Sequence, residues 1–347
     1  MKRKSALRVF METKTFTLLL LLAFIVVVFA VLTPAGGFLK PRNIKNIINA
    51  MSVNSILTIG AGCLLVSGQI DLSVGAIGTL SGVVFALLLS KYGVPVIPAA
   101  VIALAVVAVF GFINALLINR FRTQGFITTM ATGLLAQGLG YILDGGKAIA
   151  IKNDAFNAIG TKSIFDGYLP ISVIIAVAFF VVYGLLMNKT KFGQSVYLAG
   201  GNPTASYLSG IDPKRISYIL FLNSAVTGGL AGLMYASRMK SATQAGITNS
   251  SFAGMTAAIL GGISFGGGAG GMGGALLGLI ILSAFNNGIS GVGIPPYWQQ
   301  VASGALLLVA LTFDYVSLRQ KELSLRREAA RINAAPGGGA GTEGGGR

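Results

Sequence analysis

Side chains that could carry out chemistry are scarce in this chain. Histidine is absent and Cys63 is the only cysteine. The sequence therefore excludes histidine-based acid–base catalysis, a Ser-His dyad, an H-E-x-x-H metal site and a disulfide within the chain. The ten acidic residues lie outside the apolar segments or at their edges: Glu12, Asp71, Asp144, Asp154, Asp166, Asp212, Asp314, Glu322, Glu328 and Glu343. We expect no catalytic residue and no metal site.

One glycine-rich stretch resembles a nucleotide-binding loop only superficially. Between Gly261 and Gly274 the sequence GGISFGGGAGGMGG contains nine glycines in 14 residues. A phosphate-cradling loop of the form G-x-x-x-x-G-K-[ST] also needs its lysine, and this stretch has none. The composition instead predicts close backbone packing and a break between two helices.

A second break, Gly68-Gln69-Ile70-Asp71-Leu72-Ser73-Val74-Gly75, separates two apolar segments. Asp71 or Ser73 could accept a hydrogen bond from the free N–H groups of the helix that follows, and we favour this capping role. The alternative is a discontinuous helix along a transport path, where exposed backbone groups would meet a hydroxylated solute.

A third pattern predicts a short helix between two longer ones. Asn202 suits the N-cap, Pro203 suits the first helical position, and Gly210 suits the C-terminal stop. Such a helix either lies at the membrane surface without a partner or inserts into another protein.

A fourth pattern lies near the last apolar segment. Tyr297 and Trp298 suit an aromatic belt at a membrane interface. Asn286 and Asn287 could cap a helix or bind sugar hydroxyls.

Long apolar segments must position these groups. Hydrophobic residues make up 54% of the chain and charged residues 10%, against about 25% charged residues in soluble proteins. Because a membrane-spanning helix needs about 20 apolar residues, we expect an all-α polytopic bundle of about ten spans. The predicted spans are 16–32, 44–67, 74–90, 94–118, 126–143, 168–187, 216–236, 252–265, 272–290 and 298–316.

Glycine pairs four residues apart occur within these spans, at Gly78 and Gly82, Gly228 and Gly232, and Gly274 and Gly278. They predict close helix packing, and alternatively helices that slide during gating. Carriers driven by protons or sodium place carboxylates inside the membrane, and the interiors of the predicted spans contain essentially none. Uphill transport would therefore draw its energy from another subunit.

The basic residues indicate the orientation. The net charge is +16, but Lys and Arg lie in short stretches between spans and not on a basic stripe with aromatics, so we expect no nucleic-acid partner. With ten spans and a cytoplasmic N-terminus, 17 basic residues lie inside and nine outside. We therefore expect both termini inside, an uncleaved first span and three parts: a cytoplasmic segment 1–15, a membrane domain 16–316 with an inner loop 188–215, and a basic tail 317–347 with a disordered glycine-rich end.

Four ordered motifs carry a family resemblance. They are Gly68–Gly75, Gly125-Phe126-Ile127-Thr128-Thr129, the segment Gly200–Ile211, and Ala257–Gly262 with Gly266-Gly267. Together they resemble the permeases of ribose-type ABC importers, in the larger group that includes branched-chain amino-acid permeases. The chain departs from the common pattern at Gly125, where proline is frequent, and at 252–258, where many sugar permeases carry a carboxylate.

The resemblance implies a type II-like permease in the bacterial inner membrane that passes a small neutral sugar, pentose or hexose. The permease would pair with a second copy or a paralogue and bind no cofactor itself. A separate ATPase would use ATP and Mg, and a periplasmic or lipoprotein binding protein would deliver the sugar near 144–167. The segment 202–211 would be the coupling helix, with the ATPase-coupling residues Gly200, Asn202, Pro203, Ala205, Ser209, Gly210 and Ile211. The path candidates are Asn49, Asn54, Ser55, Thr58, Asp71, Ser73, Phe126, Thr128 and Asn287.

Other functions fit parts of the pattern. Within the importer class, the solute could be a nucleoside, a furanosyl signalling sugar or a branched-chain amino acid. A facilitator or secondary carrier that needs no partner would share the small-residue packing and the helix breaks.

Overall fold

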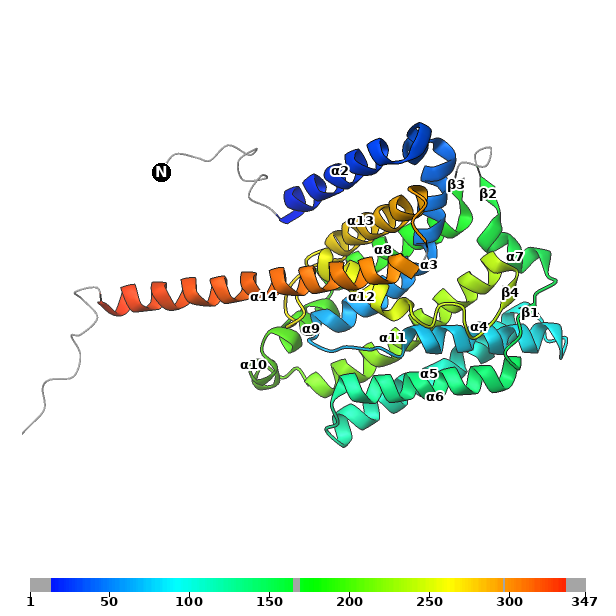
Figure 1. Ribbon diagram of the computed structural model, residues 1–347. Coiled ribbons are helices and arrows are strands. Elements are labelled where there is room, and N and C mark those ends of the chain that lie inside the picture. Colours follow the sequence, from blue (N-terminus) through cyan, green and yellow to red (C-terminus); the bar gives the residue numbers. More distant parts are fainter. Residues whose placement is uncertain (1–13, 165–168, 296, 335–347) are drawn as a thin grey trace, which may run out of the picture.

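The computed structural model describes residues 14–164, 169–295 and 297–334, and these form a helical bundle (Figure 1). The all-α class expected from composition is confirmed. The α-helices are α2 (Lys14–Leu32), α3 (Pro41–Val66), α4 (Val74–Ser90), α5 (Val96–Arg120), α6 (Gly125–Asp144), α7 (Asp154–Thr161), α8 (Ile171–Lys189), α9 (Lys191–Gly201), α10 (Pro203–Leu208), α11 (Pro213–Met239), α12 (Ser250–Leu260), α13 (Met272–Gly291) and α14 (Tyr297–Ala334). The other elements are the 3-10 helix η1 (Pro34–Leu39) and the strands β1 (Ile149–Ala150), β2 (Ser163–Ile164), β3 (Leu169–Pro170) and β4 (Ser241–Ala242).

Each of the ten predicted spans contains a helix. Among the described residues, eight helices are long and apolar enough to cross a bilayer, namely α2, α3, α5, α6, α8, α11, α13 and the first part of α14. The other two, α4 and α12, are apolar but shorter, with 17 and 11 residues. The chain is therefore a multi-pass membrane protein.

One predicted boundary is wrong. Helix α12 ends at Leu260 instead of 265, because the backbone turns at Gly262, whose φ of +91° lies in the left-handed region. The last predicted span, 298–316, agrees with the apolar segment Tyr297–Val316, but helix α14 itself continues to Ala334 and projects well beyond the bundle (Figure 1). The predicted N-terminal segment before Lys14 and the glycine-rich end after Ala334 lie outside the described residues.

Helices α3, α4 and α11 form the centre of the bundle. Most of the second half of α3 is buried, as is one long face of α11. By contrast, α2, α5, α6 and α8 expose large apolar side chains such as Phe24, Ile97 and Ile142, which are 65%, 77% and 78% exposed. Water would not favour so broad an apolar surface, so these are the faces that meet lipid.

The paired glycines bring helices into backbone contact. A Cβ atom at Gly232 of α11 would lie 1.7 Å from the carbonyl oxygen of Gly78 on α4, and a Cβ at Gly78 would lie 2.4 Å from Gly228 O. In the third pair, a Cβ at Gly274 would lie 2.1 Å from Gly261 O. The predicted close packing is confirmed. The glycine pair of α4 packs directly against the glycine pair of α11.

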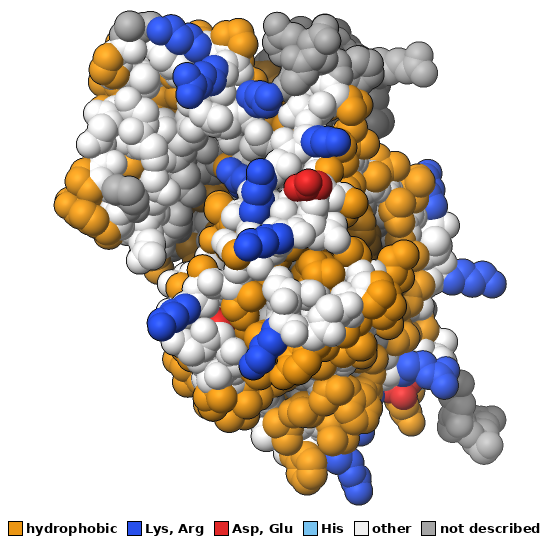
Figure 2. All heavy atoms as spheres, turned by 90° about the vertical axis from the view of Figure 1, so that its right-hand side faces the viewer, with side chains coloured by type: hydrophobic (Ala, Val, Ile, Leu, Met, Phe, Trp, Pro, Cys, Tyr) orange, Lys and Arg blue, Asp and Glu red, His pale blue; other side chains and the backbone are white. Residues whose placement is uncertain are grey.

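The two ends of the bundle differ. One end carries α9 and α10, and the opposite end carries α7 and the antiparallel pairs β1–β4 and β2–β3 (Figure 1). The segment 144–167 thus has an ordered part, in which Asp144 accepts hydrogen bonds from Gly146 N and Gln244 N at 2.7 Å each. This end presents Lys and Arg side chains with few carboxylates among them (Figure 2).

Candidate functional site

A buried polar network surrounds Asp71 in the break between α3 and α4. One carboxylate oxygen accepts hydrogen bonds from the backbone N–H of Ser73, at 2.8 Å, and from the Ser73 hydroxyl. The other accepts from the Ser224 hydroxyl of α11 at 2.7 Å. Both oxygens are therefore engaged by the protein, as a buried carboxylate requires.

The network extends into two further helices. The Ser73 hydroxyl accepts a hydrogen bond from Asn114 Nδ2 of α5 at 3.0 Å. The Thr132 hydroxyl of α6 donates to Asn114 Oδ1 at 2.6 Å. Residue Leu72 donates its N–H to Thr129 Oγ1 at 3.1 Å. The break thus ties α5, α6 and α11 together.

This geometry bears on two expectations, the position of Asp71 relative to the spans and the capping of the helix that follows it. Asp71 does not lie at the edge of the spans, because its partner Ser224 is near the middle of α11. The capping role is confirmed for Asp71, which accepts the Ser73 N–H. It is wrong for Ser73, whose side chain makes no cap hydrogen bond. Instead, the Ser251 hydroxyl of α12 accepts the Gly75 N–H at 2.8 Å.

The short helix predicted from Asn202, Pro203 and Gly210 begins and ends as expected. Helix α10 has Asn202 at its N-cap, whose side chain accepts the Ala205 N–H at 2.9 Å, and Pro203 is its first residue. Gly210 follows with a φ of +80°. The predicted coupling residues all lie between Gly200 and Ile211, and most of them are exposed at the α9–α10 end of the bundle.

The glycine-rich stretch between Gly261 and Gly274 packs against the chain that leads into α10. Gly268 donates its N–H to Val66 O at the end of α3, at 2.7 Å. A Cβ at Gly267 would lie 2.9 Å from Gly200 O, and one at Gly268 would lie 2.6 Å from Gly201 Cα. The expected close packing and helix break are confirmed.

Two side chains fix the stretch in place. The Tyr197 hydroxyl of α9 donates to Gly270 O at 2.8 Å, and partial burial raises the pKa of this phenol. On the other side, Asp314 of α14 accepts from the Phe265 N–H at 3.0 Å and the Ser264 hydroxyl at 3.2 Å. The turn before α10 is thus connected to α3 and α14.

Gly200→Ala is expected to destabilise this junction, and Gly201→Ala is not. A Cβ at Gly200 would lie 2.0 Å from Val66 O, which cannot move without shifting α3, whereas the nearest atom to a Cβ at Gly201 is 3.7 Å away. Overpacking of this kind costs about 1–3 kcal/mol. Thermal unfolding of the two detergent-solubilised variants, compared with the unchanged protein, measures the difference. Equal unfolding temperatures would contradict the assigned contact.

The predicted path residues are not brought into one site. Four lie on α3, two in the break, two on α6 and one on α13: Asn49, Asn54, Ser55, Thr58, Asp71, Ser73, Phe126, Thr128 and Asn287. Several hydrogen-bonding groups are already engaged. The Thr58 and Ser55 hydroxyls donate to carbonyls of their own helix, and Asn287 Oδ1 accepts from Asn43 Nδ2 at 2.8 Å. Their role in a path remains a prediction.

Sequence reasoning missed two features. Tyr183 of α8 donates its hydroxyl hydrogen bond to Asn223 Oδ1 of α11, and both side chains are half-buried within spans. Lone polar residues in apolar spans signal such pairs, although the sequence does not indicate the partner. The second feature is the apolar tip of α10, where Tyr207 and Leu208 are 69% and 81% exposed.

Known proteins resemble this chain along most of its length. Residues 43–311 match the family described as branched-chain amino acid transport system / permease component. The L-arabinose ABC transporter permease protein AraH of Azospirillum brasilense is 33% identical over 297 residues, 85% of this chain and 86% of the relative.

Two further relatives agree. The ribose import permease protein RbsC of Bacillus subtilis is 33% identical, over 84% of this chain and 89% of its own. The galactose/methyl galactoside import permease protein MglC of Escherichia coli is 31% identical, over 82% and 90%. No solved structure gives a significant match.

The helical membrane bundle, the four ordered motifs and the match across residues 43–311 lead to one conclusion. The chain belongs to the branched-chain amino acid transport system / permease component family and is a membrane-spanning transport permease of the kind found in ABC sugar importers.

Proposed function

We propose that this chain is the membrane-spanning subunit of an ATP-driven importer that passes a small neutral monosaccharide, a pentose or hexose, into the cytoplasm. The observation that carries the proposal is identity of 31–33% over more than four fifths of the chain to permeases named for arabinose, ribose and galactose. These names include both pentoses and a hexose, so the proposal covers both.

The interior chemistry supports a neutral solute. Within the described spans, polar groups such as Asn54, Tyr183 and Asn223 are half-buried amides and a phenol. The carboxylate of Asp71 has both oxygens hydrogen-bonded to the protein. A path lined by the amides and the phenol would offer hydrogen bonds to sugar hydroxyls without a fixed charge that would retain an ion.

The exposed tip of α10 supports a separate ATPase as partner. Tyr207 and Leu208 present apolar surface on a helix whose start and end are fixed by Asn202 and Gly210. A partner that hydrolyses Mg-ATP would bury this tip, and Gly200, Pro203, Ala205, Ser209 and Ile211 would shape the contact. The glycine stretch behind α10 would then pass its movement to α3 and α14.

The opposite end suits a soluble binding protein. Exposed basic side chains surround α7 and β4 there, including Lys147, Lys152, Lys162 and Lys240 (Figure 2). Carboxylates on a periplasmic or lipid-anchored sugar-binding protein would complement them. In this proposal both termini would lie in the cytoplasm of a bacterium, and a second permease copy or a paralogue would complete the path.

Uptake is expected to require ATP on the cytoplasmic side. The permease, its ATPase and its binding protein would be reconstituted in vesicles with radiolabelled arabinose, ribose or galactose. We expect uptake with ATP and Mg²⁺, and none with a non-hydrolysable analogue or without the ATPase, because the described spans offer no free carboxylate to couple an ion. Uptake by the permease alone would instead establish a facilitator or secondary carrier.

The identity of the sugar is best tested on the binding protein. Calorimetric titration with pentoses, hexoses, nucleosides and leucine separates the sugar from the other solutes of the importer class. Tight binding of leucine or a nucleoside, with no sugar bound, would overturn the monosaccharide assignment while leaving the ATP-driven mechanism intact.

A further inference from the structure

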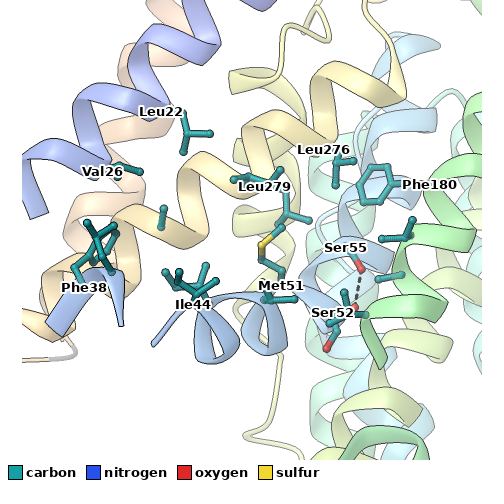
Figure 3. A pocket seen from close by; sticks show the side chains of 18 residues that line it. Leu22, Val26, Phe38, Ile44, Met51, Ser52, Ser55, Phe180, Leu276 and Leu279 are labelled. Carbon is teal, nitrogen blue, oxygen red and sulfur yellow. Dashed lines mark hydrogen bonds between the residues drawn. The ribbon is translucent and has the colours of Figure 1, made fainter. Parts of the chain in front are cut away.

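A cavity of about 480 Å³ lies between the membrane helices and reaches the 3-10 helix η1 and the start of α3. Its walls come from α2, η1, α3, α8 and α13, and Figure 3 shows Leu22 and Val26 on one side and Leu276 and Phe180 on another. The volume is many times the roughly 30 Å³ of one water molecule, and apolar cavities of proteins stay dry. In the membrane, the apolar molecule available to fill it is lipid.

The cavity does not suit a sugar. Two polar residues line the cavity. The Ser52 hydroxyl donates to Asn49 O at 2.8 Å, and the Ser55 hydroxyl donates to Ser52 O at 2.6 Å, the bond that Figure 3 shows. The other lining side chains are aliphatic, aromatic or methionine. A sugar placed there would leave its hydroxyls without hydrogen bonds, at a considerable cost. An acyl chain needs none.

Three cations lie where the cavity reaches the start of α3. Leu39 and Ile44 line the cavity, and Lys40, Arg42 and Lys45 occupy the same short stretch of chain. Lys40 and Arg42 are exposed and Lys45 is half-buried. The five elements that form the cavity contain no acidic residue in their sequence. The three cations are therefore neighbours in sequence of residues that line this end of the cavity, and no carboxylate of the same elements competes for them.

We propose that this cavity binds one acyl chain of an anionic phospholipid, whose phosphate is held by Lys40, Arg42 and Lys45. The apolar walls accept the chain, and the cations select the headgroup, as basic pockets between membrane helices do. Helix α2 contributes to one wall with few buried residues of its own, Leu18, Ile25 and Phe29. The lipid would thus complete the packing of α2 against the bundle.

Tryptophan quenching tests the proposal directly. Trp298, the only tryptophan, is replaced by phenylalanine, and Phe180→Trp places the reporter on the cavity wall. The protein is reconstituted in phosphatidylcholine vesicles and titrated with phosphatidylglycerol or phosphatidylcholine carrying brominated acyl chains. We expect phosphatidylglycerol to quench at a mole fraction about 10- to 100-fold lower, since basic side chains near the membrane surface attract anionic headgroups.

Two sets of variants separate the headgroup from the chain. Lys40→Gln/Arg42→Gln/Lys45→Gln is expected to abolish the preference for phosphatidylglycerol, while the control Lys91→Gln/Lys147→Gln/Lys152→Gln retains it. Ala176→Phe, which fills the cavity from α8, is expected to reduce quenching by both lipids.

Three results would overturn the proposal. The first is equal quenching by the two lipids in the reporter protein. The second is an unchanged preference in the Lys40/Arg42/Lys45 variant. The third is absence of quenching by either lipid, which would mean that another protein surface covers the cavity.

Discussion

Tyr207→Glu and Leu208→Glu are each expected to abolish ATP-driven sugar uptake while leaving the permease folded in the membrane. Both side chains are more than two thirds exposed on α10, where they make up an apolar tip. Their substitution disturbs no buried contact of the permease itself. In the complex, a carboxylate would be buried against an apolar pocket of the ATPase without a partner, which costs several kcal/mol. We expect uptake to fall about 100-fold or more.

A matched control distinguishes docking from general surface damage. Tyr92 is 66% exposed, close to the 69% of Tyr207, and lies between α4 and α5 toward the end opposite α10. Tyr92→Glu is expected to leave ATPase association unchanged. Co-purification of the ATPase with each variant, together with uptake in vesicles, makes the comparison. Normal association and uptake by Tyr207→Glu and Leu208→Glu would remove α10 from the coupling role.

Local signals in the sequence were sufficient to predict where α10 begins and ends. Asn202, Pro203 and Gly210 each act through a backbone preference within a few residues, so their effect does not depend on distant parts of the chain. The apolar tip was not predicted, because the exposure of Tyr207 and Leu208 depends on whether α9, α11 or another element covers them. That is a property of the tertiary structure.

Glycine spacing predicted close packing but not which helices would meet. The pairs Gly78/Gly82 and Gly228/Gly232 lie about 150 residues apart in sequence, and either could have packed against any span. The structure places them face to face, with Gly78 O beside Gly232. Spacing within one helix defines a small-residue face, whereas the partner follows from the arrangement of all the spans.

Hydropathy indicated the end of the last span at 316 but not the helix beyond it. Helix α14 continues because Gln320, Lys321, Glu322 and the following residues form helices well in water. Hydropathy was wrong about Asp71. It placed Asp71 at a membrane edge, because two apolar runs end there. The break in fact lies among α5, α6, α11 and α12, where hydrogen bonds from other helices replace those of water.

Asp71→Ala is expected to cause the largest loss of stability among single substitutions in the described network. It would leave the Ser73 N–H, the Ser73 hydroxyl and the Ser224 hydroxyl without their acceptor. Each buried unsatisfied group costs about 1–3 kcal/mol, so the sum is about 3–5 kcal/mol after partial relaxation. Asp71→Asn keeps one oxygen acceptor and nearly the same shape, so its loss should be smaller.

The single cysteine supplies the measurement. Cys63 is 1% exposed on α3, one turn before the break, so a thiol-reactive dye labels it only when the bundle opens. Labelling during a temperature ramp should give the order unchanged protein, Asp71→Asn, Asp71→Ala, from most to least stable. Asp154→Ala, an exposed carboxylate on α7, should match the unchanged protein.

The same series separates stability from transport at the break. If Asp71 only holds α4 and α11 together, then Asp71→Asn should recover most of the uptake as it recovers the unfolding temperature. If the break also opens during transport, Asp71 would lose its hydrogen bonds from Ser73 and Ser224 in the open conformation, and its carboxylate would be exposed. Asp71→Asn would then preserve stability but alter uptake, because it removes that carboxylate. Since both oxygens of Asp71 already accept hydrogen bonds from Ser73 and Ser224, we expect the first result. Uptake lost at full stability would instead place this carboxylate in the transport path.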